Sequence, residues 1–73
     1  MSTFEKVAQL LAEYKDLDIN TITMDTTFNS LNLDSLDIAE MVMNIEDDMN
    51  ITLELDENMK TISDIVAAID AAK

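Results

Sequence analysis

The sequence of 73 residues contains no cysteine, no histidine, no proline and no glycine. Without cysteine there is no disulfide framework, no thiolate nucleophile and no cysteine-based zinc site. Without histidine the chain lacks the usual general base and the commonest metal ligand. These absences argue against an enzyme in its own right, and we assign no catalytic residue.

Long apolar runs are absent as well. No stretch approaches the roughly 18 apolar residues of a membrane span, and the N-terminal MSTFEKVAQ lacks the pattern of a signal peptide. We therefore expect a cytoplasmic protein without a membrane span. The length predicts one domain over residues 1–73, and a chain of this size buries only about 60% of the surface that its unfolded form exposes.

Positive charge is scarce: four lysines face sixteen acids, for a net charge of −12. Lys15 and Lys60 bracket a stretch of 44 residues that contains no lysine and holds twelve of the acids. Nucleic acids and anionic membranes would repel such a surface, so we expect basic protein surfaces as partners. A hydrophobic fraction of 48% argues against disorder.

Three segments show the apolar spacing of amphipathic helices. The first is expected over residues 3–14, the second from about Asp34 as N-cap to Met49, and the last from about residue 62. Ser2 with Glu5, and Thr61 with Asp64, have the spacing of capping pairs. The expected buried faces are Phe4, Val7, Ala8, Leu11 and Tyr14 in the first helix, Ile38, Met41, Val42, Ile45 and Met49 in the second, and Ile62, Ile65, Val66 and Ile69 in the last.

The connections are unusual because the ordinary helix stops, glycine and proline, are missing. We expect several asparagines to supply left-handed backbone instead; the candidates are Asn20, Asn29, Asn32, Asn50 and Asn58. Residues 16–34 form a long loop, and recurring apolar side chains should pin it to the core: Leu17, Ile19, Ile22, Met24, Phe28 and Leu31.

Residues 53–59, LELDENM, predict a weak short helix or a turn. Together the segments predict an all-α protein, a small four-helix bundle with three main amphipathic helices, one short helix and a long loop between the first two. A β arrangement is disfavoured because only NITLEL alternates with a period of two.

Two acidic patterns bear on metal binding and catalysis. Asp16, Asp18 and Asn20 occupy alternate positions of a loop that resembles an EF-hand, but threonine replaces the required glycine and glutamate at Thr21 and Thr27. Asp47 and Asp48 are adjacent on a helix with no pocket implied. We therefore expect no dedicated metal site and no acid–base pair.

Ser35 opens the second helix between Asp34 and Asp37. A serine there commonly caps the helix. Alternatively, its hydroxyl is modified by a phosphate-bearing group, because free backbone N–H groups and the positive end of the helix dipole accommodate a phosphoryl oxygen. The neighbouring carboxylates repel a phosphate, so these residues leave both alternatives open.

The outer face of the second helix is mixed. With Ile38 and Val42 pointing inward, the opposite face carries Leu36, Glu40, Met43 and Asp47. Single exposed apolar residues are common. As a docking surface the arrangement is nonetheless coherent, because acids would steer a basic partner while the two apolar side chains supply a desolvated contact.

The segment LNLDSLDIAEMVMNIEDDMNI resembles the acyl carrier proteins, whose signature is Phe-x-x-Leu-Gly-x-Asp-Ser-Leu-Asp followed by an acidic helix. The later TISDIVAAI resembles the closing pattern of that family. The family glycine is replaced by Asn32, and the usual Ile-Pro after Ile51 is missing. The matching positions are Phe28, Leu31, Asp34, Ser35, Leu36, Asp37, Glu40, Val42, Met43, Ile45 and Glu46, then Thr61, Ile62, Asp64 and Ile69.

The resemblance implies that Ser35 carries 4′-phosphopantetheine, added by a phosphopantetheinyl transferase from coenzyme A, and that its thiol holds acyl groups as thioesters. The protein would be a monomer that shuttles acyl cargo among the basic surfaces of fatty-acid-synthesis enzymes, performing no chemistry itself. The docking residues that it implies are Asp34, Leu36, Asp37, Glu40, Met43, Glu46 and Asp47.

Two alternatives remain. A stand-alone carrier of polyketide, aminoacyl or D-alanyl cargo would share the mechanism, although a D-alanyl carrier is expected to differ around the serine and to lack the SLD continuation. In a different class, an unmodified acidic helical adaptor would bind a basic protein, and Ser35 would only cap its helix.

Overall fold

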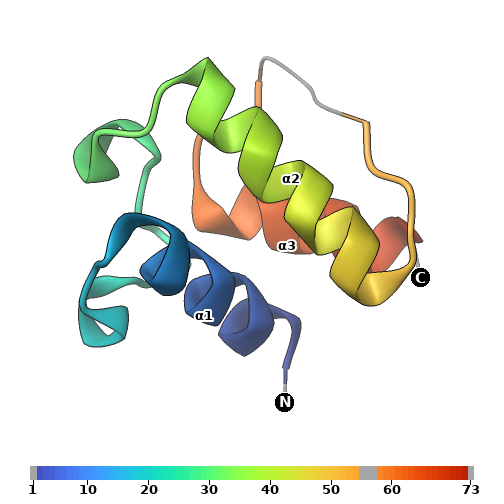
Figure 1. Ribbon diagram of the computed structural model, residues 1–73, viewed down its shortest axis with the longest axis horizontal. Coiled ribbons are helices and arrows are strands. Elements are labelled where there is room, and N and C mark those ends of the chain that lie inside the picture. Colours follow the sequence, from blue (N-terminus) through green and yellow to red (C-terminus); the bar gives the residue numbers. More distant parts are fainter. Residues whose placement is uncertain (1, 55–57, 73) are drawn as a thin grey trace.

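The computed structural model describes residues 2–54 and 58–72. Within them the chain forms three α-helices and two short 3-10 helices, in the order α1 (Thr3–Lys15), η1 (Ile19–Thr21), η2 (Asn29–Leu31), α2 (Ser35–Met49) and α3 (Ile62–Ala72) (Figure 1). The only β pairing in this described part is an isolated bridge between Thr27 and Thr61. The predicted all-α class is confirmed, and no helix in these residues is long and apolar enough to cross a bilayer.

The helix α1 begins with the predicted capping box. The Ser2 hydroxyl accepts a hydrogen bond from the Glu5 N–H at 3.1 Å, and the Glu5 carboxylate accepts one from the Ser2 N–H at 3.1 Å. The helix ends where Asp16 adopts left-handed backbone (φ 55°). Of the five asparagines considered for that role, Asn32 and Asn50 adopt it, at φ 60° and 56°.

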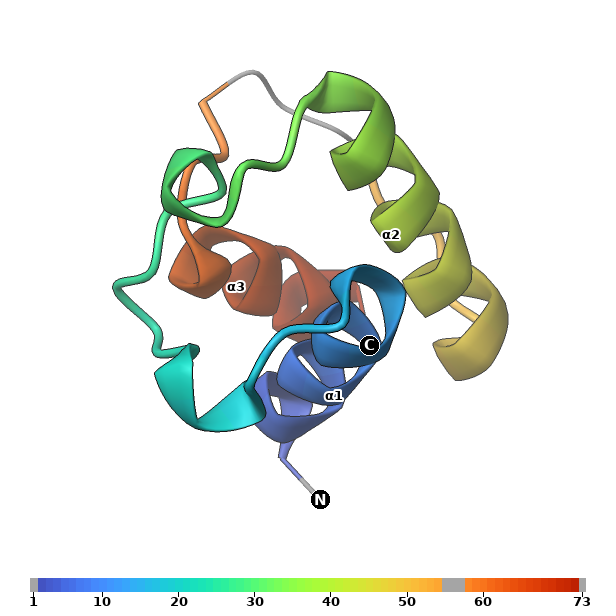
Figure 2. The same cartoon turned by 60° about the vertical axis from the view of Figure 1, so that its left-hand side comes forward.

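The helix α1 packs against both other long helices, whereas no Cα atom of α2 lies within 8 Å of one in α3 (Figure 2). The space between the three helices is filled by apolar side chains. The buried core consists of Val7, Ala8, Leu11, Ile22, Phe28, Leu33, Met41, Val42, Ile45, Ile62, Ile65, Val66 and Ile69. The predicted helix faces supply most of it, while Phe4, Ile38 and Met49 are only partly buried against it.

The loop between α1 and α2 is attached to the core, as predicted, but not by every apolar residue. Ile22 and Phe28 are buried, and Leu17 and Leu31 pack against the core in part. The prediction is wrong for two others: the side chains of Ile19 and Met24 are 41% and 40% exposed. Irregular backbone has no fixed period, so apolar character alone does not determine which loop side chains turn inward.

The start of α3 is held by Thr61 and Asp64. The Asp64 N–H donates to the Thr61 hydroxyl at 3.3 Å, and the Thr61 N–H donates to the Asp64 carboxylate at 3.1 Å. The Lys60 N–H donates to the same carboxylate at 2.8 Å. The predicted capping pair is confirmed, and the backbone N–H groups of Lys60 and Thr61 hold the pKa of Asp64 below its ordinary value.

Of the short helix or turn expected over residues 53–59, the helix is not found in the described part, because residues 51–54 and 58–60 contain no helix, whereas Asn58 lies in a turn. Residues 55–57 lie outside the described residues. The Leu53 N–H donates to a side-chain oxygen of Glu46 at 2.8 Å, so a carboxylate of α2 satisfies this backbone group.

Candidate functional site

Ser35 is the first residue of α2 and its side chain is exposed. The residue that caps the helix is Asp34: its carboxylate accepts from the Asp37 N–H at 2.8 Å, and the Asp37 carboxylate accepts from the Asp34 N–H at 3.3 Å. Within the described residues, no polar group hydrogen-bonds to the Ser35 hydroxyl. The alternative in which Ser35 serves as the helix cap is therefore wrong.

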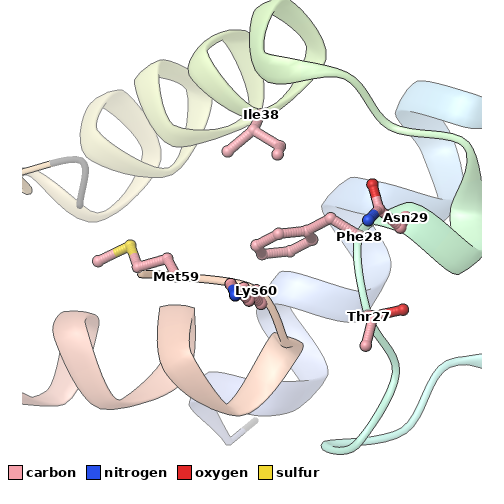
Figure 3. A pocket seen from close by; sticks show the side chains of 6 residues that line it. All are labelled: Thr27, Phe28, Asn29, Ile38, Met59 and Lys60. Atoms are coloured by element: carbon pink, nitrogen blue, oxygen red, sulfur yellow. The ribbon is translucent and has the colours of Figure 1, made fainter. Parts of the chain in front are cut away.

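A cavity of about 260 Å³ lies beside the first turn of α2 (Figure 3). Its lining residues are Thr27, Phe28, Asn29, Ile38, Met59 and Lys60. Ser35 and Ile38 are three residues apart on α2, so they share one side of the helix. Ser35 is not itself a lining residue, but it lies within one turn of Ile38, which is.

The cavity is lined by both apolar and polar side chains. Phe28, Ile38 and Met59 supply apolar atoms, while polar groups come from Thr27, Asn29 and Lys60. The cavity lies between α2 and the segment that precedes α3 (Figure 3). Since Met side chains repack easily, Met59 gives this wall some freedom to adjust.

The outer face of α2 has the composition that the sequence predicts. Leu36 and Met43 are 69% and 59% exposed, and they are the two most exposed large apolar side chains among the described residues. Glu40 and Asp47 on the same face are exposed, as is Asp34 at the cap. These exposures agree with the outer face that the helical period predicts for α2.

Asp37 and Glu46, two further acids expected on this surface, also have bonding roles within the protein, in addition to the capping carboxylate of Asp34. Asp37 is half-buried, and it accepts hydrogen bonds from Asp34, Tyr14 and Lys15. Glu46 is half-buried and accepts from the Leu53 N–H at 2.8 Å. The Asp34 N–H, with smaller contributions from Lys15 and Tyr14, holds the pKa of Asp37 below its ordinary value.

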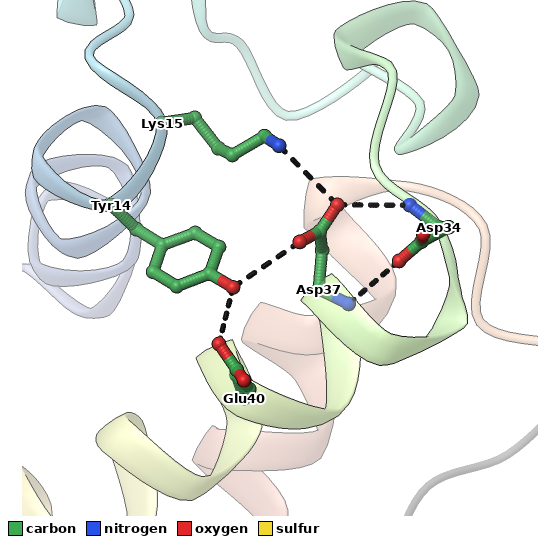
Figure 4. A network of polar contacts seen from close by, with 5 residues as sticks. All are labelled: Tyr14, Lys15, Asp34, Asp37 and Glu40. Atoms are coloured by element: carbon green, nitrogen blue, oxygen red, sulfur yellow. Dashed lines mark hydrogen bonds and ion pairs between the residues drawn. The ribbon is translucent and has the colours of Figure 1, made fainter.

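A polar network joins the end of α1 to the first turns of α2 (Figure 4). The Tyr14 hydroxyl is hydrogen-bonded to Glu40 and lies 3.2 Å from Asp37, while the Lys15 ammonium lies 3.3 Å from Asp37. The hydrogen bond to Glu40 is the largest cause of a strongly raised pKa of Tyr14. The sequence does not predict this network. Tyr14 was expected on the buried face, but it is only partly buried, and its hydroxyl at the edge of that face was the one signal of a polar contact.

The described residues contain no group of three or more acidic side chains arranged to hold a metal ion. A second ion pair joins α1 and α2 far from Ser35, between Lys6 and Asp48 at 2.8 Å. Two of the three described lysines are thus used to tie α1 to the acidic helix.

A family model described as a phosphopantetheine attachment site matches residues 5–69. The chain belongs to this family. It is similar to the acyl carrier proteins of Streptococcus pneumoniae and Streptococcus pyogenes, with 36% identity over 70 residues that cover 96% of this chain and 95% of each relative. It is also 30% identical to the acyl carrier protein of Lactococcus lactis subsp. cremoris over the full length of both chains. It is therefore an acyl carrier protein with 4′-phosphopantetheine as its prosthetic group.

The residues around Ser35 fit the phosphate of this prosthetic group. Ile38 N–H and Asp37 N–H are satisfied by Asp34, but in the described part of the chain the N–H groups of Ser35 and Leu36 have no partner. Such free groups at a helix N-terminus suit an anionic oxygen. The ion pair of Asp37 with Lys15 offsets part of the repulsion that this carboxylate would exert on a phosphate.

Proposed function

We propose that Ser35 is the attachment residue for 4′-phosphopantetheine and that residues 1–73 act as one acyl-carrier domain. The observation that carries this proposal is that Ser35 is exposed on the first turn of α2, is free of the capping role and lies within one turn of Ile38, which lines the cavity. The Ser35 oxygen would form a phosphodiester as it loses its proton and the remainder of coenzyme A leaves. The chain itself would catalyse no reaction.

The cavity supports acyl cargo. When bound, the prosthetic group supplies a thiol that holds an acyl group as a thioester, and an apolar chain would be shielded from water by Phe28, Ile38 and Met59. We therefore favour fatty-acid synthesis as the pathway. Polyketide, aminoacyl and D-alanyl cargo are the alternatives, and the last two are polar groups that gain little from apolar walls.

Basic surfaces of the phosphopantetheinyl transferase and of fatty-acid-synthesis enzymes would be the partners. The net charge of −12 favours rapid association with such surfaces. The proposed docking residues are Leu36 and Met43 as apolar contacts and Asp34, Asp37, Glu40, Glu46 and Asp47 as acids. A monomeric state and a cytoplasmic location, expected from the sequence, belong to the same proposal.

The test is intact-protein mass measurement after incubation with coenzyme A and a promiscuous phosphopantetheinyl transferase. We expect a single mass increase that Ser35→Ala abolishes. Ser30→Ala is the matched control, because Ser30 is a second exposed serine close to the start of α2 and should leave the increase unchanged. No increase in the wild-type chain would support the unmodified adaptor, and an increase retained in Ser35→Ala would place the attachment elsewhere.

A further inference from the structure

The Tyr14 hydroxyl of α1 is shared between two carboxylates of α2. It hydrogen-bonds to the Oε2 atom of Glu40 and lies 3.2 Å from the Oδ1 atom of Asp37 (Figure 4). A phenol has one proton, so it donates fully to only one of these acceptors at a time. The significance of the contact therefore depends on which carboxylate has other donors.

Asp37 has other donors. Its Oδ2 atom accepts from the Lys15 ammonium at 3.3 Å and from the Asp34 N–H at 3.3 Å. Its position is also fixed by the capping box at the start of α2. Loss of the Tyr14 hydroxyl would leave Asp37 with its charged partner and its capping bond.

Glu40 depends on Tyr14 alone. In the described part of the chain, the Tyr14 hydroxyl is the only donor to the Glu40 carboxylate, and it engages Oε2 and leaves Oε1 without a partner. Glu40 is exposed and lies between Leu36 and Met43 on the outer face of α2. An unrestrained glutamate at such a position would have to be ordered when a partner binds.

We propose that Tyr14 is a positioning residue for docking: it holds the Glu40 carboxylate in one orientation, with Oε1 available to a lysine or arginine side chain of the partner enzyme. This inference rests on the proposed function and deepens it. The Glu40 side chain is already ordered in the free protein, so less conformational entropy is lost when it forms an ion pair with the partner. In this way α1 contributes to a surface that α2 presents.

The experiment is steady-state kinetics of phosphopantetheine transfer from coenzyme A, with the carrier protein as the varied substrate. Tyr14→Phe removes the hydroxyl and keeps the ring. We expect it to raise KM by roughly two- to tenfold, the factor that corresponds to ordering one side chain, and to leave kcat unchanged. Glu40→Gln should raise KM at least as much, because it removes the charge that Tyr14 positions.

The double variant decides the mechanism. If Tyr14 acts through Glu40, then Tyr14→Phe has no further effect on KM in the Glu40→Gln background. Effects that multiply would mean that Tyr14 meets the partner directly, which would overturn the proposal, as would an unchanged KM in either single variant.

Lys6→Gln is the control for fold stability. It removes a different tie between α1 and α2, the ion pair of Lys6 with Asp48, far from Ser35. Helix content and Tm would be measured for all variants by circular dichroism. We expect Lys6→Gln to leave KM unchanged; a rise in KM equal to that of Tyr14→Phe would show that loosening of the helices is the cause and would contradict positioning. A wild-type chain that accepts no phosphopantetheine would contradict the proposed function itself, a result distinct from all of these.

Discussion

The backbone N–H of Phe28 donates a hydrogen bond to the carbonyl of Lys60 at 2.9 Å. Two further bonds, from Ile62 N–H to the Thr26 carbonyl at 2.9 Å and from Ser63 N–H to the Met24 carbonyl at 3.0 Å, extend this pairing. The long loop is thereby attached to the segment that begins α3. It carries the Phe28 ring into the core, 3% exposed, where the same ring lines the cavity beside Ser35.

Phe28→Ala is expected to lower the free energy of unfolding by about 3–5 kcal/mol, because a buried aromatic ring is lost and a void remains. Small domains have a total stability of only about 5 kcal/mol, so Phe28→Leu, which loses less volume, is the variant suited to urea titration. Met24→Ala is the control from the same loop: its side chain is 40% exposed, and the change should stay within about 0.5 kcal/mol. Equal losses for Phe28→Leu and Met24→Ala would contradict this role of Phe28.

The helices and their starts could be predicted from the sequence because their determinants are local. Ser2 with Glu5 and Thr61 with Asp64 cap helices as predicted, since a capping pair needs only a fixed spacing of three residues. Asp34 is the N-cap as predicted, although its partner Asp37 is an aspartate in place of the usual glutamate. The outer face of α2 follows from the helical period alone.

The remaining features depend on contacts between distant segments. Nothing in the sequence around Ile19 and Met24 distinguishes them from the buried Ile22 and Phe28, because the loop direction is set by its pairing with residues 60–63. The hydrogen bond between Tyr14 and Glu40 spans 26 positions and requires the packing of α1 on α2. The left-handed Asp16 was missed because asparagine is the better candidate on local grounds alone.

Acid should destabilise the fold partly through Asp64. Hydrogen bonds from the backbone of Lys60 and Thr61 lower the pKa of Asp64 in the folded state, and the unfolded value is about 3.9. A lowered folded pKa gives stability that is present above the unfolded pKa and is lost as the pH falls through the folded pKa. The urea concentration at the unfolding midpoint should therefore decrease as the pH is lowered below about 4. The decrease should be less steep in Asp64→Asn, where the titrating group is absent.

Asp47→Asn is the control for this pH dependence. It removes one negative charge from an exposed position of α2 but no capping carboxylate. Its urea midpoint should decrease with falling pH as steeply as that of the wild-type chain. If the urea midpoints of Asp64→Asn and Asp47→Asn decrease equally steeply with falling pH, the capping carboxylate of α3 does not contribute to acid unfolding.

Added salt should stabilise this protein. The net charge is −12, and the ion pairs in the described part of the chain are Lys6–Asp48 and Lys15–Asp37. Screening weakens repulsion among the many acids more than it weakens two partly exposed ion pairs, because at about 0.1 M salt the Debye length is only about 10 Å. Tm measured by circular dichroism is expected to rise from low to moderate NaCl and with added MgCl₂. A Tm that is flat or falls would show that self-repulsion is not limiting.

Leu36→Gln and Met43→Gln separate docking from stability. Both side chains are mostly exposed, so each substitution should change the free energy of unfolding by no more than about 0.5 kcal/mol. If they form the apolar centre of the docking surface, each loses more than about 1 kcal/mol of binding, and KM for phosphopantetheine transfer rises roughly five- to tenfold. Met24→Gln is the matched control, since it makes the same change at an exposed methionine of the loop outside α2. An unchanged KM in both α2 variants would contradict a docking role for this face, because replacing a side chain that does not contact the partner removes no binding energy. An equal rise of KM in Met24→Gln would contradict it as well.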